Sequence, residues 1–109
     1  MLNEDDDPRA VLSRELGRVL SRLQGLSLER LQRPDDQGVS PAARTHECSQ
    51  QLADLAADAC GRDRRPVPVL AAHGTADQLA VTAHDVLAEG DGLAIGHAAA
   101  ALTALRRAL

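Results

Sequence analysis

Residues 73–90 read HGTADQLAVTAHDVLAEG, a stretch that combines a helix-start signal, helical apolar spacing and a helix-stop signal. Thr75 and Gln78 have the spacing of a capping box, in which each side chain bonds the backbone N–H of the other residue. Gly90 is the residue type that commonly closes a helix in a left-handed turn. At about 100° per residue, the apolar and polar residues of this stretch fall on opposite sides of a helix. The apolar arc is Ala76, Leu79, Ala80, Ala83, Val86 and Leu87. The polar arc is Gln78, Thr82, Asp85 and Glu89. We therefore predict an amphipathic helix from Thr75 to Gly90 that buries its apolar arc and turns its polar arc to solvent.

The composition predicts one small domain with an unusual core. A chain of 109 residues has room for a single hydrophobic core. It contains no Phe, Tyr or Trp, so Leu, Val and Ala must fill the interior. Small side chains favour helix over strand and let helices approach closely. They also bury little area per residue, which favours self-association as a further source of burial.

Two more helices are predicted to begin with a capping residue followed by proline at the first helical position. These starts are Asp7-Pro8 and Ser40-Pro41, separated by a turn-rich linker over residues 33–40. The first helix repeats apolar residues at steps of four and three: Leu12, Leu16, Val19, Leu23 and Leu26. Leu28 and Leu31 do not continue this pattern, and Gly25 and Ser27 lie where it breaks. We therefore expect the helix to end near Gln24 and a short second helix to start at Ser27.

The helix that starts at Ser40-Pro41 is expected to end at Gly61. Its predicted buried stripe is Cys48, Leu52, Leu55, Ala56 and Ala59, and its predicted solvent face is His46, Glu47, Gln50, Asp54 and Asp58. Cys48 is expected to be buried, and Cys60 is the cysteine that reagents should reach. Twelve residues separate them by about 18 Å along a continuous helix. This distance excludes a disulfide between them, which needs Cα atoms within about 7 Å.

Residues 61–72, GRDRRPVPVLAA, change character, because Pro66 and Pro68 forbid helix and favour an extended segment. Asp91-Gly92 then forms a tight joint into a final helix, whose His97 lies off its apolar stripe: Ile95, Ala98, Leu102, Leu105 and Leu109. We therefore predict an all-α fold over residues 1–109, a small antiparallel bundle of about four helices with one extended, proline-containing connection.

Charge and hydropathy argue against several classes of protein. The formal net charge is −4, whereas a nucleic-acid binder needs a clustered basic surface, and the chain has no aromatic side chain on which a base could stack, so a nucleic-acid partner is disfavoured. The chain contains no run of about 18 apolar residues, the length that a membrane-spanning helix requires. The N-terminus, MLNEDDDPRA, is acidic where a secretory signal is basic and then apolar. We expect a cytoplasmic protein whose residues 1–7 form a disordered acidic N-terminus.

Histidines and neighbouring carboxylates are the candidates for chemistry. The segment PVPVLAAHGTAD, residues 66–77, resembles the α/β-hydrolase turn that presents the acid of a catalytic triad, which implies that role for Asp77. However, the chain contains no G-x-S-x-G nucleophile elbow and has no room for the parallel sheet. His73, His84 and Asp85 resemble the H…HD pattern of HD phosphohydrolases at a shorter spacing. We predict no catalytic residue and no cofactor, and keep His73, Asp77 and His84, joined by His97, as candidate metal ligands.

The leading hypothesis is a non-enzymatic protein–protein interaction or regulatory module. We expect a homodimer, or a chain that presents a helical face or residues 66–74 to a protein partner, because Val11, Val81 and Leu93 lie outside the apolar stripes. The alternative is a metal- or small-ligand-binding helical domain centred on His73, Asp77 and His84. A helix-turn-helix over residues 26–59 is disfavoured, because its second helix is acidic and DNA phosphates would repel it.

Overall fold

The structure is a computed structural model that describes residues 7–109. Within this range the chain forms five α-helices, one 3₁₀ helix and no strand: α1 (Pro8–Gln24), α2 (Leu28–Gln32), α3 (Pro41–Cys60), η2 (Ala72–Gly74), α4 (Thr75–Glu89) and α5 (Gly92–Ala108). The all-α prediction is confirmed, including the short second piece after α1. The expected disordered N-terminus falls largely on residues 1–6, which lie outside the described residues. At Asp7 that expectation is wrong, because its side chain caps α1.

The predicted helix starts at Asp7 and Ser40 are confirmed. The side chain of Asp7 accepts a hydrogen bond from the backbone N–H of Arg9, and that of Ser40 accepts one from Ala43. Asp91 caps α5 in the same way, through the N–H of Ala94 at 2.8 Å. At the other end of α3, Gly61 has φ +69°, a left-handed conformation that favours glycine.

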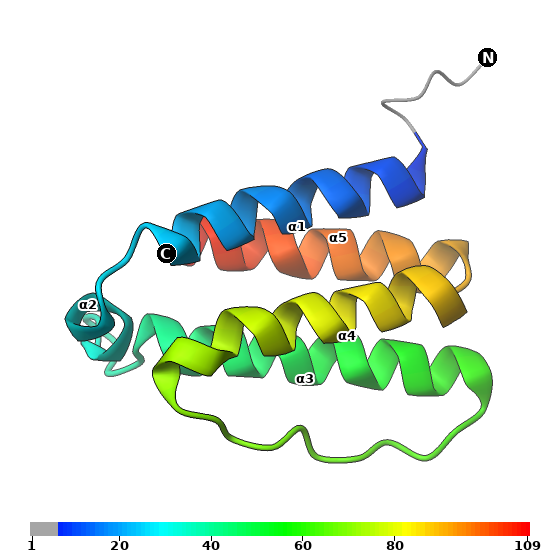
Figure 1. Cartoon of the computed structure of the whole chain (residues 1–109). Coiled ribbons are helices and arrows are strands. Elements are labelled where there is room, and N and C mark those ends of the chain that lie inside the picture. The colour runs from blue at the N-terminus through cyan, green and yellow to red at the C-terminus, as the bar shows by residue number, and fades with distance from the viewer. Residues whose placement is uncertain (1–6) are drawn as a thin grey trace.

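The four long helices surround the core, and each contacts the next in the order α1–α5–α3–α4, with α4 contacting α1 again. Residues 61–71, hereafter the strap, return along the length of α3, so α3 and α4 run in the same direction (Figure 1). The ends of α3 and α4 accordingly meet, with the Cys60 thiol 3.2 Å from the Glu89 carboxylate. The expected antiparallel arrangement holds for α1 with α4 and for α3 with α5, whereas α1 and α5 run parallel.

The core follows the predicted apolar stripes. Its fully buried side chains come from all four long helices: Leu12, Val19, Leu52, Leu79, Ala83, Val86, Ala98 and Leu102. Two of them are alanines, which let neighbouring helices approach closely where no aromatic ring fills the space. In the stripe predicted for α3, Ala59 is exposed, whereas the polar residues Thr45 and Ser49 are fully buried. The stripe of α3 is therefore rotated toward small polar residues that hydropathy does not identify.

One charged side chain is buried in the bundle. Glu15 on α1 accepts hydrogen bonds from Arg106 of α5 at 3.1 Å and from Arg18 at 3.0 Å. Burial by itself raises the pKa of Glu15, but the hydrogen bond and charge of Arg106, helped by Arg18, outweigh it and lower that pKa. The pair therefore ties the first long helix to the last.

Three details predicted for α4 are wrong. Thr75 and Gln78 do not form a capping box, because η2 leads directly into α4 and the Thr75 hydroxyl donates to the carbonyl of Ala72 instead. Thr82 is buried rather than exposed, and its hydroxyl donates to the Leu79 carbonyl. Gly90 has φ −76°, so it is not left-handed. Its lack of a side chain is needed for space, because a Cβ would lie 2.6 Å from the Val86 carbonyl oxygen.

Among the helices of residues 7–109, none combines the length and the apolarity required to cross a lipid bilayer.

Candidate functional site

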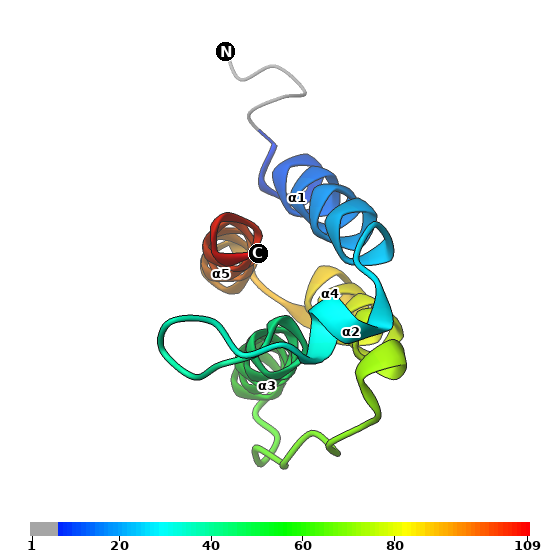
Figure 2. The same ribbon diagram turned by 90° about the vertical axis from the view of Figure 1, so that its left-hand side faces the viewer.

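The strap leaves the helical bundle and passes alongside α3 before it reaches α4 (Figure 2). Two cavities lined by the strap, α3 and α4 form a cleft. Side-chain hydrogen bonds from α3 hold the backbone of the strap. Gln50 accepts from the Val67 N–H at 2.7 Å and donates to the Arg65 carbonyl at 3.0 Å. His46 bonds the Val67 carbonyl at 2.9 Å through Nε2, which must carry the hydrogen because a carbonyl only accepts.

A side chain from α4 holds the strap from the other side. The Gln78 amide donates to the Pro68 carbonyl at 2.7 Å, so α3 and α4 both bind the strap backbone. Arg64 adds a bidentate ion pair with Asp58 of α3, at 3.0 and 2.6 Å. Hydrogen bonding to Arg64 lowers the pKa of Asp58, and the same contact raises the pKa of Arg64. The expectation that this polar face of α3 is open to solvent is therefore wrong at His46, Gln50 and Asp54, which are partly covered.

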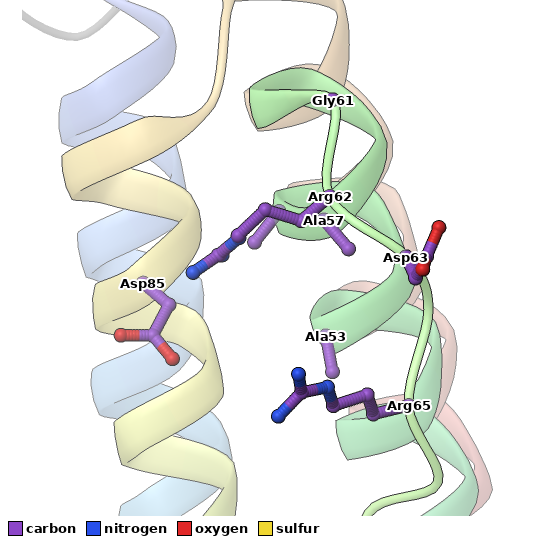
Figure 3. Close-up of a pocket in the computed structure, with 8 residues that line it drawn as sticks. Ala53, Ala57, Gly61, Arg62, Asp63, Arg65 and Asp85 are labelled. Atoms are coloured by element: carbon purple, nitrogen blue, oxygen red, sulfur yellow. The ribbon is translucent and has the colours of Figure 1, made fainter.

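One part of the cleft is a charged cavity of about 620 Å³ beside the end of α3. Its floor consists of alanines, of which Ala56 and Ala57 are almost fully buried. Figure 3 shows Arg62 and Arg65 reaching from the strap toward α4, where Asp85 faces them. Arg62 is held by an ion pair with Glu89 of α4. The strap side of the cavity therefore carries Arg62, Arg65 and Asp63, whose carboxylate turns away from α4 in Figure 3, and the α4 side carries Asp85.

Cys60 lies at the rim of this region and is exposed, as predicted. Its thiol donates to the Glu89 carboxylate, and this hydrogen bond, together with the negative charge, raises the pKa of Cys60. Cys48 is buried, as predicted, and burial raises its pKa to about 12. Both thiols are thus kept protonated near neutral pH, which makes them weak nucleophiles.

The other part of the cleft is an apolar groove of about 570 Å³, hereafter the strap groove. The strap contributes one wall, α4 the other, and α3 contributes Ala53. The other apolar lining residues are Pro66, Val67, Pro68 and Leu70 of the strap and Val81 of α4. Val81 is 61% exposed and Leu70 46% exposed, and Val69, which lies between two lining residues of the strap, is 83% exposed. Solvent therefore reaches apolar side chains on both walls.

Two opposite charges mark the ends of the strap groove. Arg65 also lines the charged cavity, so it lies at the end of the groove near Gly61. Asp77 also lines a third cavity, which lies against α2, so it marks the other end. Among residues 7–109, neither side chain forms an ion pair within the chain.

The third cavity, of about 580 Å³, extends the apolar surface around the start of α4. Its lining includes Leu26 and the exposed Leu28 of α2, with His73 and Asp77 on the opposite side. Because Asp77 lines both cavities, the two apolar surfaces adjoin. Three of the five large apolar side chains exposed in the described chain, Leu28, Leu70 and Val81, therefore line these two adjoining cavities, whereas Val69 and Leu93 line neither.

The candidate metal ligands are only partly brought together. His73 and Asp77 line the same cavity, whereas His84 lies exposed on α4 and His97 exposed on α5. Within residues 7–109, no group of three or more His, Cys, Asp or Glu side chains has an arrangement that could hold a metal ion. The residues that organise the cleft are instead Gln50, Gln78 and Arg65. The two glutamines are not identifiable from the sequence, because an amide on a helix surface has no distinctive pattern, although the two prolines do indicate the strap.

Comparison of the chain with protein-family models, with curated proteins and with solved structures gave no match.

Proposed function

We propose that this chain is a non-enzymatic protein–protein interaction module, acting in the cytoplasm, that binds a protein partner through the strap groove. The observation that carries the proposal is the concentration of exposed apolar side chains, with Leu70 and Val81 on opposite walls of one groove. Large contiguous apolar patches are rare on monomeric soluble proteins, and they commonly mark protein interaction sites. The two unpaired cysteines agree with a reducing compartment.

The groove is suited to binding because its walls are already in position. Gln50 and His46 hold the strap from α3, and Gln78 holds it from α4. A partner therefore does not have to order the strap, so less of the binding free energy is lost to conformational entropy. An apolar floor with a few charges at its rim is also the usual anatomy of a protein interface.

The raised pKa values of both thiols support an interaction role over nucleophilic catalysis. Cys48 is buried, and the Cys60 thiol donates a hydrogen bond to the Glu89 carboxylate. Both thiols therefore stay protonated, and neither supplies a reactive thiolate near pH 7.

The experiment is a peptide-display selection against the native chain, immobilised sparsely so that chains do not meet. Selected peptides are then tested against Val81→Arg, which places a charge inside the groove, and against Leu93→Arg, an equally exposed position outside it. We expect peptides with apolar residues that bind the native chain and Leu93→Arg equally, and bind Val81→Arg at least about tenfold more weakly.

Two outcomes would overturn the proposal. Peptides that bind all three proteins equally would assign recognition to another surface. A selection that enriches no peptide, together with a native chain that associates with nothing in solution, would remove the interaction role altogether.

A further inference from the structure

We infer that the strap groove binds a second copy of this chain in a twofold-symmetric dimer, in which Arg65 of each copy pairs with Asp77 of the other. This inference rests on the proposed function and names the partner of the same groove. It is carried by the positions of these two charges and by the apolar side chains between them.

The charges make the groove complementary to itself. Arg65 lies at the end shared with the charged cavity, and Asp77 at the end shared with the cavity against α2. In a twofold dimer the same surface meets itself in reverse. Arg65 then faces Asp77 of the partner subunit, and the same contact recurs at the other end. Two charges that form no ion pair within residues 7–109 thereby gain two ion pairs.

The apolar side chains fit the same arrangement. Val81 lies one helical turn after Asp77 on α4 and lines the groove between the two charges. Around a twofold axis near Val81, the exposed face of α4 packs against its own copy, and the exposed strap residues Val69 and Leu70 cover the flank. Such a contact adds buried apolar area to a chain whose core contains no aromatic side chain.

The strap is a poor edge for strand addition, which favours contact through side chains instead. Pro66 and Pro68 have no N–H to donate to an added strand, and Gln50 already bonds the N–H of Val67. A second copy therefore approaches through α4 and the apolar side chains of the strap.

The first test is the mass of the native chain by light scattering across a micromolar concentration range. We expect a dimer that dissociates on dilution. Val81→Arg should be monomeric over the same range, because it buries an unpaired charge at the centre of the contact. Leu93→Arg, the matched control outside the groove, should dimerise like the native chain.

The second test reverses the charges. Arg65→Asp and Asp77→Arg should each weaken dimerisation at least about tenfold, because each creates two like-charge contacts. An equimolar mixture of these two variants should restore the dimer, since every contact in the mixed dimer again joins opposite charges. The double variant Arg65→Asp/Asp77→Arg should restore it as well. Arg107→Asp, an exposed position on α5 with the same change in net charge as Arg65→Asp, is the control and should dimerise normally.

These experiments separate a failure of the dimer from a failure of the interaction module. A chain that is monomeric at all concentrations, but whose groove selects peptides, overturns the second copy and leaves the interaction module in place. A dimer that resists Val81→Arg uses another surface. A dimer weakened by both charge reversals, but not restored by mixing them, overturns the twofold pairing.

Discussion

At the scale of single residues, small side chains reveal how tightly the alanine-rich bundle is packed. Gly90 joins α4 to α5 where a Cβ would lie 2.6 Å from the Val86 carbonyl oxygen and 3.1 Å from a methyl carbon of the same residue. Ser49 is fully buried on α3, and its hydroxyl has no hydrogen-bond partner among the described residues. The first position leaves no room for a methyl group, and the second buries a polar atom at a cost.

Gly90→Ala is expected to destabilise the fold by about 2 kcal/mol, because the added methyl group collides with backbone that cannot move independently of α4. Gly96→Ala is the matched control. Gly96 lies inside α5, where a Cβ would meet nothing within 4 Å, so alanine should raise the free energy of unfolding by about 0.5–1 kcal/mol. Urea unfolding of the two variants measures both values, and equal effects would contradict the steric argument.

Ser49→Ala is expected to stabilise the protein by about 1 kcal/mol, since it removes a buried hydroxyl that no described group satisfies and replaces it with a better helix former. Thermal unfolding should show a Tm about 4 °C higher. Thr45→Ala provides the comparison, because the equally buried Thr45 hydroxyl donates to the Pro41 carbonyl at 2.8 Å. A lower Tm for Ser49→Ala would contradict the prediction.

At the scale of the elements, the strap is held by side chains rather than by a backbone ladder. Gln50 provides two of its hydrogen bonds, to Val67 and Arg65. Most strap residues are exposed, so their release exposes little additional apolar surface. The strap should therefore open locally at a lower free energy than the bundle unfolds.

Gln50→Ala is expected to make the strap about tenfold more sensitive to trypsin after Arg62 and Arg64, because it removes two hydrogen bonds of about 0.5–1.5 kcal/mol each. The unfolding midpoint in urea should change little. Gln51→Ala, at the exposed neighbouring position, controls for helix propensity and should leave cleavage at the native rate. Equal cleavage of both variants would mean that Gln50 does not hold the strap.

The helices could be predicted from local sequence patterns, whereas the contacts that hold the strap against α3 and α4 could not. The caps at Asp7 and Ser40 and the leucine spacing of α1 depend on residues within one or two turns, so sequence alone identifies them. Gln50 and Gln78 bind carbonyl groups ten or more residues away, and nothing local marks such contacts. The predicted capping box fails for a related reason, because Thr75 bonds the Ala72 carbonyl in η2 and Gln78 bonds the Pro68 carbonyl in the strap. The sequence therefore predicts the extended strap, but not the residues that hold it against α3 and α4.

At the scale of the whole molecule, the buried ion pair between Glu15 and Arg106 links stability to pH. The pKa of Glu15 is lower in the folded chain than in the unfolded chain. The unfolded chain therefore binds the proton more readily in acid, so this contribution is complete above about pH 4.5 and is lost as the pH falls through the folded pKa.

Glu15→Gln is expected to lower the free energy of unfolding by about 1–2 kcal/mol at pH 7, because it removes the charge from the hydrogen bond with Arg106. Glu15 is buried and Arg106 is only partly exposed, so water screens this ion pair incompletely. The difference from the native chain should shrink as the pH falls below about 4.5. Urea unfolding of both proteins from pH 7 to pH 3 measures this difference, and other carboxyl groups cancel in the comparison. A difference that stays constant with pH would contradict the assignment.

The contact of α1 with α5 joins the first long helix of the described chain to the last. On the ribosome, α1 emerges with its leucine stripe uncovered, and the helix that covers it is completed 84 residues after Gln24. At about 5–20 residues per second, that interval is roughly 4–17 s. The apolar face of α1 is therefore exposed on the nascent chain for several seconds before α5 can pack against it, and exposed apolar surface promotes aggregation. The speed of translation should therefore affect how much of the chain folds correctly.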